Sequence, residues 1–288
     1  MARVYTGTLV SAGFAGLSSV LDESATARFP GMPVVLGRDR VVVLHELLLG
    51  AFDDRRVYLR RVLKAGGAVV AEWTFTGTQT RDWMQVAPTH RPVAFEGVTL
   101  LWTGATGTIT DVHVYFDVAR VKAQLGAGPK ELRGLPAIAL PTGPPEALER
   151  EDSAREMGDV AVVRTELDAL EARDEKSYLA TMSEDVVLAT AERAEPARGL
   201  AAIQGAYKNI VDSINELDTA VMNVWGVGAF VAAEYTITGM QRAAIGWVPL
   251  ARDRVVTLHV VDVVELRDGR ITRISRYDNP GEVDSPVP

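Results

Sequence analysis

Four side chains that can donate or accept protons recur at every second position near residue 115. Asp111, His113, Tyr115 and Asp117 are separated by Val112, Val114 and Phe116. In a β-strand, alternate side chains lie on the same face, about 7 Å apart. If that face lines a pocket, His113 and Asp117 are candidate general acid/base groups with a phenol between them. If it meets solvent, the same row is structural, and the strand pattern alone leaves both interpretations open.

The other face of this strand is wholly apolar. Val112, Val114 and Phe116 need burial, for instance against another sheet. This arrangement would leave the polar row to line a pocket between its own sheet and the helices.

The surrounding sequence predicts helices followed by a meander of strands. Amphipathic helices are expected over 38–52, 153–173 and 199–215, with a short helix near 176–182 and a glycine-broken one before Leu21. Strand-like runs cover 55–63, 68–80, 92–102 and 108–117, and then 218–225, 230–242, 254–266 and 270–278. Because helices and strands do not alternate, the pattern indicates an α+β fold with an antiparallel sheet wrapped on helices.

The two halves of the chain resemble each other at a constant offset. AEWTFTGTQ (71–79) and AEYTITGMQ (233–241) lie 162 residues apart and are identical at six of nine positions. Between the halves, 126–145 holds five of the fourteen prolines, which is typical of a semi-rigid connector. We therefore expect one domain at 1–128, a Pro-rich linker at 129–150 and a second domain at 151–288. The helical pattern that leads into the second domain begins at Glu146, near the end of the linker.

Composition excludes several classes of protein. The 288 residues carry a net charge of −8 and no cysteine, so the sequence lacks a basic footprint for nucleic acid or anionic lipid and lacks thiolate ligands. The four histidines do not pair at metal-ligand spacing, so neither metal nor cofactor is expected. The apolar stretch 41–52 is too short to span a bilayer, and 9–21 reads as a packing helix rather than a signal peptide. These features predict a cytoplasmic protein with no membrane partner.

A family resemblance joins these observations. The run DVHVYFDVARVKAQLGAGP (111–129) resembles the C-terminal signature of SnoaL-like polyketide cyclases and ester cyclases, and AFDD (51–54), AVVAEWTFTGTQ (68–79) and APTHRPVAFEGV (87–98) match other family elements in order. RITRISRYDNPGEV (270–283) is similar to the ketosteroid-isomerase-like branch. The resemblance implies the nuclear transport factor 2-like fold: two tandem cystatin-like cones, each a curved antiparallel sheet packed on about three helices.

Proteins of this fold commonly pair through the outer sheet face. The apolar face of Val112, Val114 and Phe116 would suit such pairing. We therefore expect the two copies to form an intrachain pseudo-dimer, and a homo-oligomer stays open as an alternative.

The resemblance also implies roles for individual residues. In the cyclases, the aspartate that closes the last strand is the general acid/base, and Asp117 occupies that position, with His113 and Tyr115 assisting. The family histidine of GTH is Gln79 here and the glycine of PTG is His90. The expected pocket residues for a small apolar molecule are Trp73, Trp83, Trp102, Tyr58, Gln79, His90 and Tyr277, although a core role also explains each aromatic.

The second copy departs further from the family. Ser275 and Asn279 stand where the first copy has His113 and Asp117, and asparagine cannot act as a general acid or base. We therefore expect a degenerate second site. Asp262, in an otherwise apolar strand, is better explained as a buried acid paired with Arg254 or Arg276 than as a catalytic group.

Two functions follow from the sequence. The first is a cofactor-independent cyclase or isomerase that acts through Asp117 on an apolar ring-type or polyketide-like substrate. The second is a non-catalytic tandem module that binds small molecules. The position of Asp117 separates them, because a carboxyl on the solvent-facing side of the sheet would leave the first function without a base.

Overall fold

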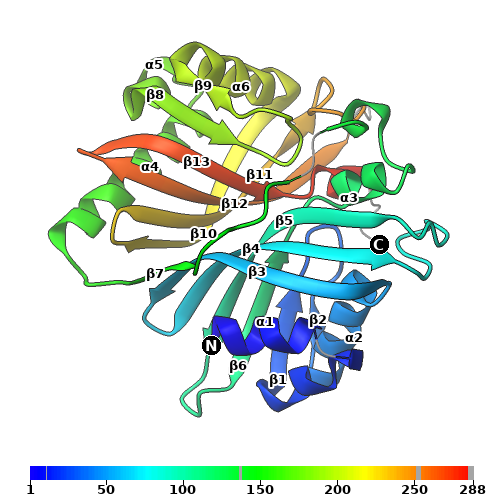
Figure 1. The fold of residues 1–288 in the computed structure, drawn as a ribbon. Helices are drawn as coiled ribbons and strands as arrows, with labels where there is room; N and C mark the ends of the chain where they lie inside the picture. The colour runs from blue at the N-terminus through cyan, green and yellow to red at the C-terminus, as the bar shows by residue number, and fades with distance from the viewer. Residues whose placement is uncertain (11, 136–137, 251–253, 285–288) are drawn as a thin grey trace. The chain divides into compact units, whose positions relative to one another are not determined.

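The computed structural model describes residues 1–10, 12–135, 138–250 and 254–284, and the chain divides into two units between Leu148 and Glu149. The first unit contains α1 (Ala2–Val10), η1 (Ala12–Ser19), β1 (Leu21–Arg28), β2 (Val35–Leu36), α2 (Arg38–Leu49), β3 (Phe52–Ala65), β4 (Ala68–Gln79), β5 (Pro92–Thr103), β6 (Ile109–Tyr115), α3 (Val118–Gln124), η2 (Lys130–Leu132) and β7 (Glu146–Glu149), which crosses the division. The second contains α4 (Ala154–Glu171), α5 (Glu175–Ala180), β8 (Met182–Ala189), β9 (Ala197–Arg198), α6 (Gly199–Ser213), β10 (Ile214–Val227), β11 (Phe230–Gln241), β12 (Val255–Arg267), β13 (Arg270–Asp278) and η3 (Pro280–Asp284). Each unit therefore has one sheet and three α-helices, which confirms the predicted α+β class (Figure 1).

Each sheet contains a parallel pair of strands. The strand orders are β2-β1-β6-β5-β4-β3-β7 and β10-β11-β12-β13-β8-β9. β1 runs parallel to β6, and β8 runs parallel to β13, so the sheets, which we expected to be antiparallel, are mixed at these two pairs. The sequence of β1, LDESATAR, is rich in residues that are uncommon in strands, which explains why its pattern did not predict one.

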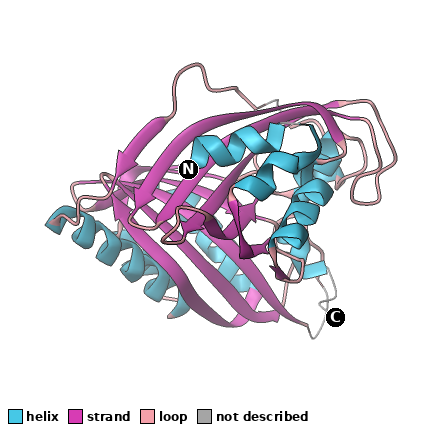
Figure 2. Cartoon of the chain, turned by 90° about the horizontal axis from the view of Figure 1, so that it is seen from below, coloured by secondary structure: helices cyan, strands magenta, loops and turns pink. Residues whose placement is uncertain are grey.

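The long strands bend at matching places in the two units. In β3 the pairing register shifts between Asp53 and Arg56, and in β10 it shifts between Asn215 and Asp218, at positions 162 residues apart. Irregular pairing of this kind increases strand twist and curvature. The strands are visibly long and twisted (Figure 2). The sheets therefore curve as the predicted cones require.

The apolar face of β6 packs inside its own unit. Val112, Val114 and Phe116 belong to the core cluster that also holds Leu9 of α1 and Leu48 of α2. The expectation that this face turns outward toward a partner sheet is therefore wrong, because these side chains fill the space between the sheet and the helices. His113 and Tyr115 alternate with them and lie on the opposite face.

The segment between the domains is partly structured. Glu146–Glu149, which we expected to begin a helix, forms the strand β7 beside β3 instead. The Arg61 Nε donates to Glu146 Oε2 at 2.8 Å and holds the start of this strand. Helix α4 begins only after Ser153, because Ser153 and Glu156 form a capping box that satisfies the first backbone N–H groups of the helix.

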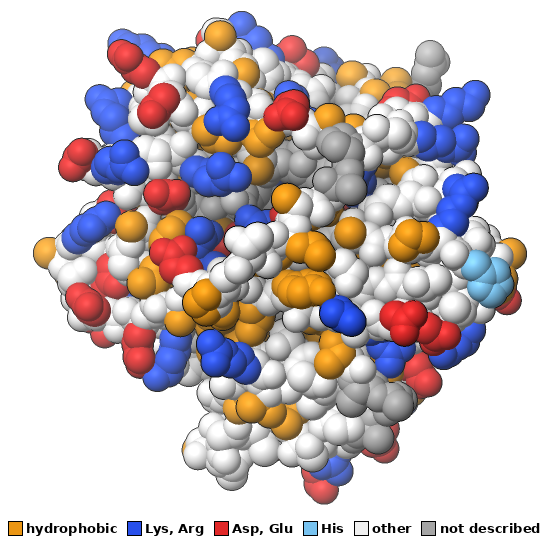
Figure 3. Space-filling model, in the orientation of Figure 1, with side chains coloured by type: hydrophobic (Ala, Val, Ile, Leu, Met, Phe, Trp, Pro, Cys, Tyr) orange, Lys and Arg blue, Asp and Glu red, His pale blue; other side chains and the backbone are white. Residues whose placement is uncertain are grey.

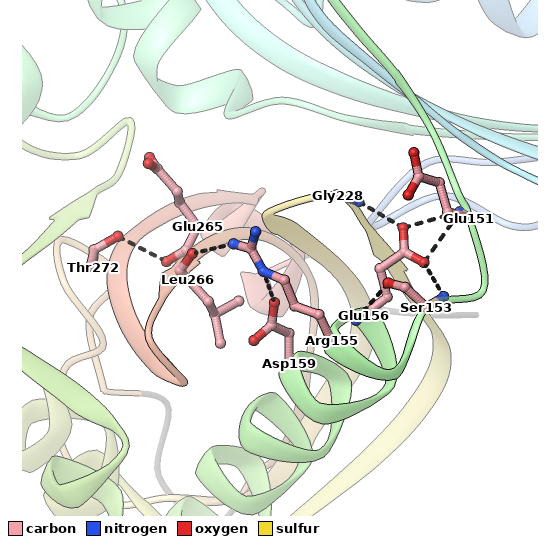
Figure 4. Close-up of polar contacts among 9 residues, drawn as sticks. All are labelled: Glu151, Ser153, Arg155, Glu156, Asp159, Gly228, Glu265, Leu266 and Thr272. Atoms are coloured by element: carbon pink, nitrogen blue, oxygen red, sulfur yellow. Dashed lines mark hydrogen bonds and ion pairs between the residues drawn. The ribbon is translucent and has the colours of Figure 1, made fainter.

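The carboxylate of Glu156 organises the entry to α4. It accepts hydrogen bonds from the backbone N–H groups of Ser153 (2.9 Å), Gly228 (2.8 Å) and Glu151 (3.2 Å), as Figure 4 shows. Burial raises the pKa of Glu156, but these N–H donors outweigh it and hold the pKa at about 2. The charged side chain therefore ties the helix start to the β10–β11 turn.

Replacing Glu156 by glutamine should destabilise the second unit at neutral pH. The folded pKa lies below the ordinary value, so the carboxylate stabilises the fold above about pH 4.5, and this contribution is lost as pH falls through about 2. We expect Glu156→Gln to lower the free energy of unfolding by about 1–3 kcal/mol at pH 7. Urea unfolding at pH 7 and pH 2 measures the effect, with Glu151→Gln as the control; an equal loss at both pH values would contradict it.

Candidate functional site

Asp117 lies where the last strand of the first sheet gives way to a helix. β6 ends at Tyr115, and Asp117 is the N-cap of α3. Its Oδ1 accepts hydrogen bonds from the backbone N–H groups of Ala119 (2.8 Å) and Arg120 (3.2 Å). The side chain is buried, with 2% of the residue exposed, so Asp117 does not face solvent.

The second carboxyl oxygen of Asp117 has no such partner. Oδ2 is buried and makes no hydrogen bond with the described residues. Burial raises the pKa of Asp117 to about 6, against the N–H donors of Arg120 and Ala119 and the charge of Arg120, which lower it. A capping carboxylate is ordinarily stabilised in its ionised form, so this raised pKa marks an unusual cap. Near neutral pH, Oδ2 can both accept and return a proton.

His113 and Tyr115 do not face the core between the sheet and the helices. The His113 ring packs against Trp102 in a tilted arrangement, with ring centroids 4.6 Å apart, and its Nε2 lies 3.1 Å from Asp111 Oδ2. This contact lies on the face of β6 that points away from the core of Val112 and Phe116. The predicted polar row therefore does not line the space between sheet and helices, because the strand presents its apolar side there.

The predicted aromatic pocket residues fall into two groups. Trp73 and Trp83 are core residues: the Trp73 ring contacts Phe95 and Phe116, and Trp83 Nε1 donates to the Leu48 carbonyl at 2.9 Å. Tyr58 and Trp102 alternate with core residues of β3 and β5, and Tyr277 with Ile274 and Arg276 of β13, so these three lie on the other faces of their sheets. Aromatic side chains, Trp73 and Trp83 among them, are thus part of the packed core of the first unit.

Gln79 is the last residue of β4, and His90 lies in the loop between β4 and β5. The Gln79 amide donates to the carbonyls of Arg81, Val86 and Ala87, and its oxygen accepts from Thr89. Gln241 holds the corresponding loop of the second unit in the same way, through Ala243 and Pro249. The side chain of Gln79 therefore holds the β4–β5 loop in place through hydrogen bonds, and His90 in that loop is exposed.

A polar chain that the sequence did not reveal crosses the core of the first unit. Tyr5 of α1 bonds His45 Nε2 at 2.5 Å, and His45 Nδ1 lies 2.7 Å from the Val41 carbonyl. Since only a protonated Nδ1 can donate to a carbonyl, Nε2 accepts from the Tyr5 hydroxyl. Burial lowers the pKa of His45 to about 4, so the imidazole is neutral. A further buried hydrogen bond of the first unit runs from Trp73 Nε1 to Thr99 Oγ1 at 2.9 Å.

An open pocket of about 330 Å³ lies at the C-terminal end of α2, apart from Asp117. Phe14, Glu46, Asp53, Arg55 and Arg81 are among its lining residues. The Arg55 guanidinium lies over the Phe14 ring at 4.8 Å, and Arg81 pairs with Asp53 at 2.8 Å. Because most of its lining residues are charged, this pocket differs from the apolar site expected for a ring-type substrate.

In the second unit, Asp262 pairs with Arg276 rather than with Arg254. No cluster of three or more potential metal ligands occurs among the described residues. Within the same ranges no helix is long and apolar enough to cross a membrane. On the face shown in Figure 3, acidic and basic side chains are interspersed.

Family models match both halves of the chain. Residues 1–125 match the SnoaL-like polyketide cyclase model, and residues 163–274 match a SnoaL-like domain model. A search of the curated proteins gave no significant match.

Each of three similar solved structures matches a part of this chain that is about as long as one domain. A candidate SnoaL-like polyketide cyclase from Jannaschia sp. CCS1 is 20% identical over 44% of this chain and 90% of its own, with a TM-score of 0.41. A candidate polyketide cyclase from Xanthomonas campestris pv. campestris is 22% identical over 46% and 98%, with a TM-score of 0.40. An LEH-like epoxide hydrolase from M. tuberculosis is 20% identical over 44% and 87%, with a TM-score of 0.37.

Proposed function

Since the chain belongs to the SnoaL-like family, with two of its domains in tandem, we propose that the first domain catalyses proton transfer on a small apolar molecule, as a cofactor-independent cyclase or isomerase. The observation that carries this proposal is Asp117 Oδ2, a buried carboxyl oxygen without a hydrogen-bond partner among the described residues. The pKa of about 6 supports it, because such a carboxyl exchanges protons readily at neutral pH.

The proposed chemistry is redox-neutral. Ionised Asp117 takes a proton from a carbon beside a carbonyl group of the substrate. In a cyclisation, that carbon then forms a bond to a second carbonyl carbon, and the new alkoxide oxygen takes the proton back from Asp117. In an isomerisation, the proton returns to a different carbon. His113 and Tyr115 are left out of this mechanism because neither makes a hydrogen bond with Asp117 Oδ2, which has no partner among the described residues.

The alternative function is a binding module without catalysis. It is favoured by the second copy, where Ser275 and Asn279 stand in place of His113 and Asp117 and supply no group that can act as a general acid or base. Proton exchange on a bound ketone separates the two functions.

The test uses 1-tetralone, a ketone fused to an aromatic ring, in D₂O. We expect the protein to accelerate deuterium exchange beside the carbonyl, with a rate that rises with pH through about 6 as Asp117 ionises. Asp117→Asn should lose at least about 100-fold of the protein-catalysed rate, since general acid–base catalysis contributes about that much or more. Asp82→Asn, at an exposed loop carboxyl, is the matched control and should keep the parent rate.

Mass spectrometry of the recovered ketone measures the exchange, and near-ultraviolet circular dichroism confirms that each variant is folded. Exchange that survives in folded Asp117→Asn would remove Asp117 from the mechanism. Binding of 1-tetralone by the parent without any exchange would favour the binding module.

A further inference from the structure

A groove of about 230 Å³ lies on the outside of the second unit, between α4 and β10, the outermost strand of its sheet. Met157, Val160 and Arg164 of α4 line it, and their i, i+3 and i+7 spacing places them on one face of the helix. Val163 and Leu167 carry the neighbouring stripe that packs into the core of the unit. Met157 and Arg164 are exposed. The groove is therefore separate from the interior between the sheet and the helices.

The floor of the groove is apolar. Val160 of α4 and Val224 of β10 both line it, and both are partly buried against the core cluster of the unit. Met157 stands at the rim with 61% of its surface exposed. An exposed methionine is a flexible apolar side chain that adapts to ligands of different shape. These side chains offer a strip of hydrocarbon contact to a ligand with an apolar body.

The helix and the strand touch where the groove ends. A side-chain carbon at Gly226 of β10 would lie 2.6 Å from the carbonyl oxygen of Glu156, so this close approach requires glycine. Both residues line the groove, and Arg164 lies eight residues further along α4, about 12 Å away along the helix axis. The volume is below the range of about 300–1,000 Å³ that is typical of sites for drug-sized ligands. The groove therefore suits a molecule with one ring and a short chain.

The charged groups of the groove leave one positive charge unmatched. Arg150 pairs with Asp152 at 2.6 Å. The Glu156 carboxylate accepts hydrogen bonds from three backbone N–H groups, as Figure 4 shows, so the start of α4 is already satisfied. Arg164, by contrast, makes no hydrogen bond or ion pair with the residues that the structure describes. A ligand with a negative group would complement it.

We propose that this groove binds a small organic acid, whose carboxylate pairs with Arg164 and whose apolar body lies against Val160 and Val224. A planar guanidinium matches a carboxylate through two parallel hydrogen bonds. A second negative charge would lie near the carboxylates of Asp152 and Glu156, so a monoanion fits better than a phosphate ester. Arg164 would repel a cation.

The matching part of the first unit is built differently. At the offset of 162 residues, Gly226 corresponds to Lys64, which carries a long side chain where the second unit has none. Helix α1 has nine residues, whereas α4 has eighteen. The close approach of helix and strand at Gly226 is therefore a feature of the second copy, and we assign the groove to the second domain alone.

The experiment titrates the full chain, labelled with ¹³C at the methionine methyl groups, with 4-phenylbutanoate. Met157 reports from the rim of the groove, and Met157→Leu assigns its signal. We expect the probe to shift the Met157 signal and to leave that of Met182, in the core of the unit, unchanged. The uncharged analogue 4-phenylbutanamide should bind about fivefold more weakly, because it cannot form the ion pair with Arg164.

The variant Arg164→Gln tests the ion pair itself. It should weaken binding of the acid about fivefold and leave binding of the amide unchanged, so that the two probes bind equally well. Unchanged amide binding also shows that the groove is intact. Added salt should weaken acid binding in the parent but not in Arg164→Gln. Arg193→Gln, at an exposed arginine elsewhere in the second unit, is the matched control and should keep the parent's preference for the acid.

The contrary outcomes are equally specific. A Met157 signal that does not move with the probe would mean that the acid binds elsewhere or not at all, and would overturn the proposal. Equal affinity of the acid and the amide in the parent would remove Arg164 from recognition. Tighter binding of 4-phenylbutan-1-amine than of the acid would show that the groove selects a cation instead.

Discussion

At pH 8 the Asp117→Asn variant should be harder to unfold than the parent protein, by about 1–3 kcal/mol. The folded pKa of Asp117 is about 6, above the ordinary value of 3.8. A raised pKa means that the contribution of this group to stability is complete below about pH 3.8 and is lost as pH rises through about 6. Two pKa units correspond to about 3 kcal/mol. Asparagine removes this loss and still caps α3, although its buried amide offsets part of the gain.

The comparison of two pH values isolates the charge. The constant effects of the asparagine side chain are the same at pH 4 and pH 8, so the variant's advantage over the parent should grow by about 3 kcal/mol between them. Urea unfolding measures the difference, and hydrogen exchange in β5 and β6 assigns it to the first unit. Asp82→Asn should show no such growth. A pH-independent difference for Asp117→Asn would mean that Asp117 is not a raised-pKa carboxyl.

A residue that weakens its own fold is informative about function. Stability would favour an amide at position 117, because the amide caps the helix without a buried charge. The carboxyl is the group that can move a proton. Gain of stability with loss of exchange in the same variant is the trade-off typical of an active site.

The fold was predictable where strands are apolar and long. The 162-residue offset between the AEWTFTGTQ and AEYTITGMQ runs places β4 and β11 at the same point of each sheet, and both strands begin and end 162 residues apart. The parallel strands β1 and β8 were missed because their sequences, LDESATAR and MSEDVVLA, mix polar and apolar residues without a regular strand pattern. Only long-range pairing with β6 and β13 makes them strands.

The face of β6 was harder to predict, because both of its sides contain side chains that can be buried. Alternation correctly separated Val112 and Phe116 from His113, but it cannot say which set meets the helices. The hydrophobic effect placed the apolar set inside. Asp117 escapes the alternation because β6 ends at Tyr115, and the cap geometry of α3 directs its carboxyl.

The burial of two polar side chains, His45 and Glu166, was harder to predict from the sequence. His45 lies within VVVLHELLL, and Glu166 lies next to Leu167 on a helix with apolar residues at 163, 167 and 170. A charged residue within an apolar stripe can rotate to the helix edge, so the pattern does not distinguish a buried acid from an exposed one. Burial, and hence the raised pKa of Glu166, follows only from the packing of α4 on the second sheet.

Loss of Arg276 should be the most destabilising single change in the second unit. Arg276→Met would leave the Asp262 carboxylate buried without its two guanidinium hydrogen bonds, and breaking a buried ion pair in this way costs about 3–5 kcal/mol. Asp262 would then depend on the Tyr235 hydroxyl alone. Urea unfolding of the full chain, with hydrogen exchange in β11–β13 to locate the loss, measures the effect.

The companion variant removes the whole polar cluster of Tyr235, Asp262 and Arg276 at once. Tyr235→Phe, Asp262→Leu and Arg276→Met together remove both charges and the hydroxyl of the cluster itself, and apolar replacement of a complete buried pair is often neutral or stabilising. The triple variant should therefore recover most of the stability lost by Arg276→Met, even though it carries more substitutions. A further loss in the triple variant would show that the pair contributes net stability. Recovery would instead mean that the stability of the second unit does not require the cluster, and that breaking the pair, rather than losing it, is what destabilises the fold.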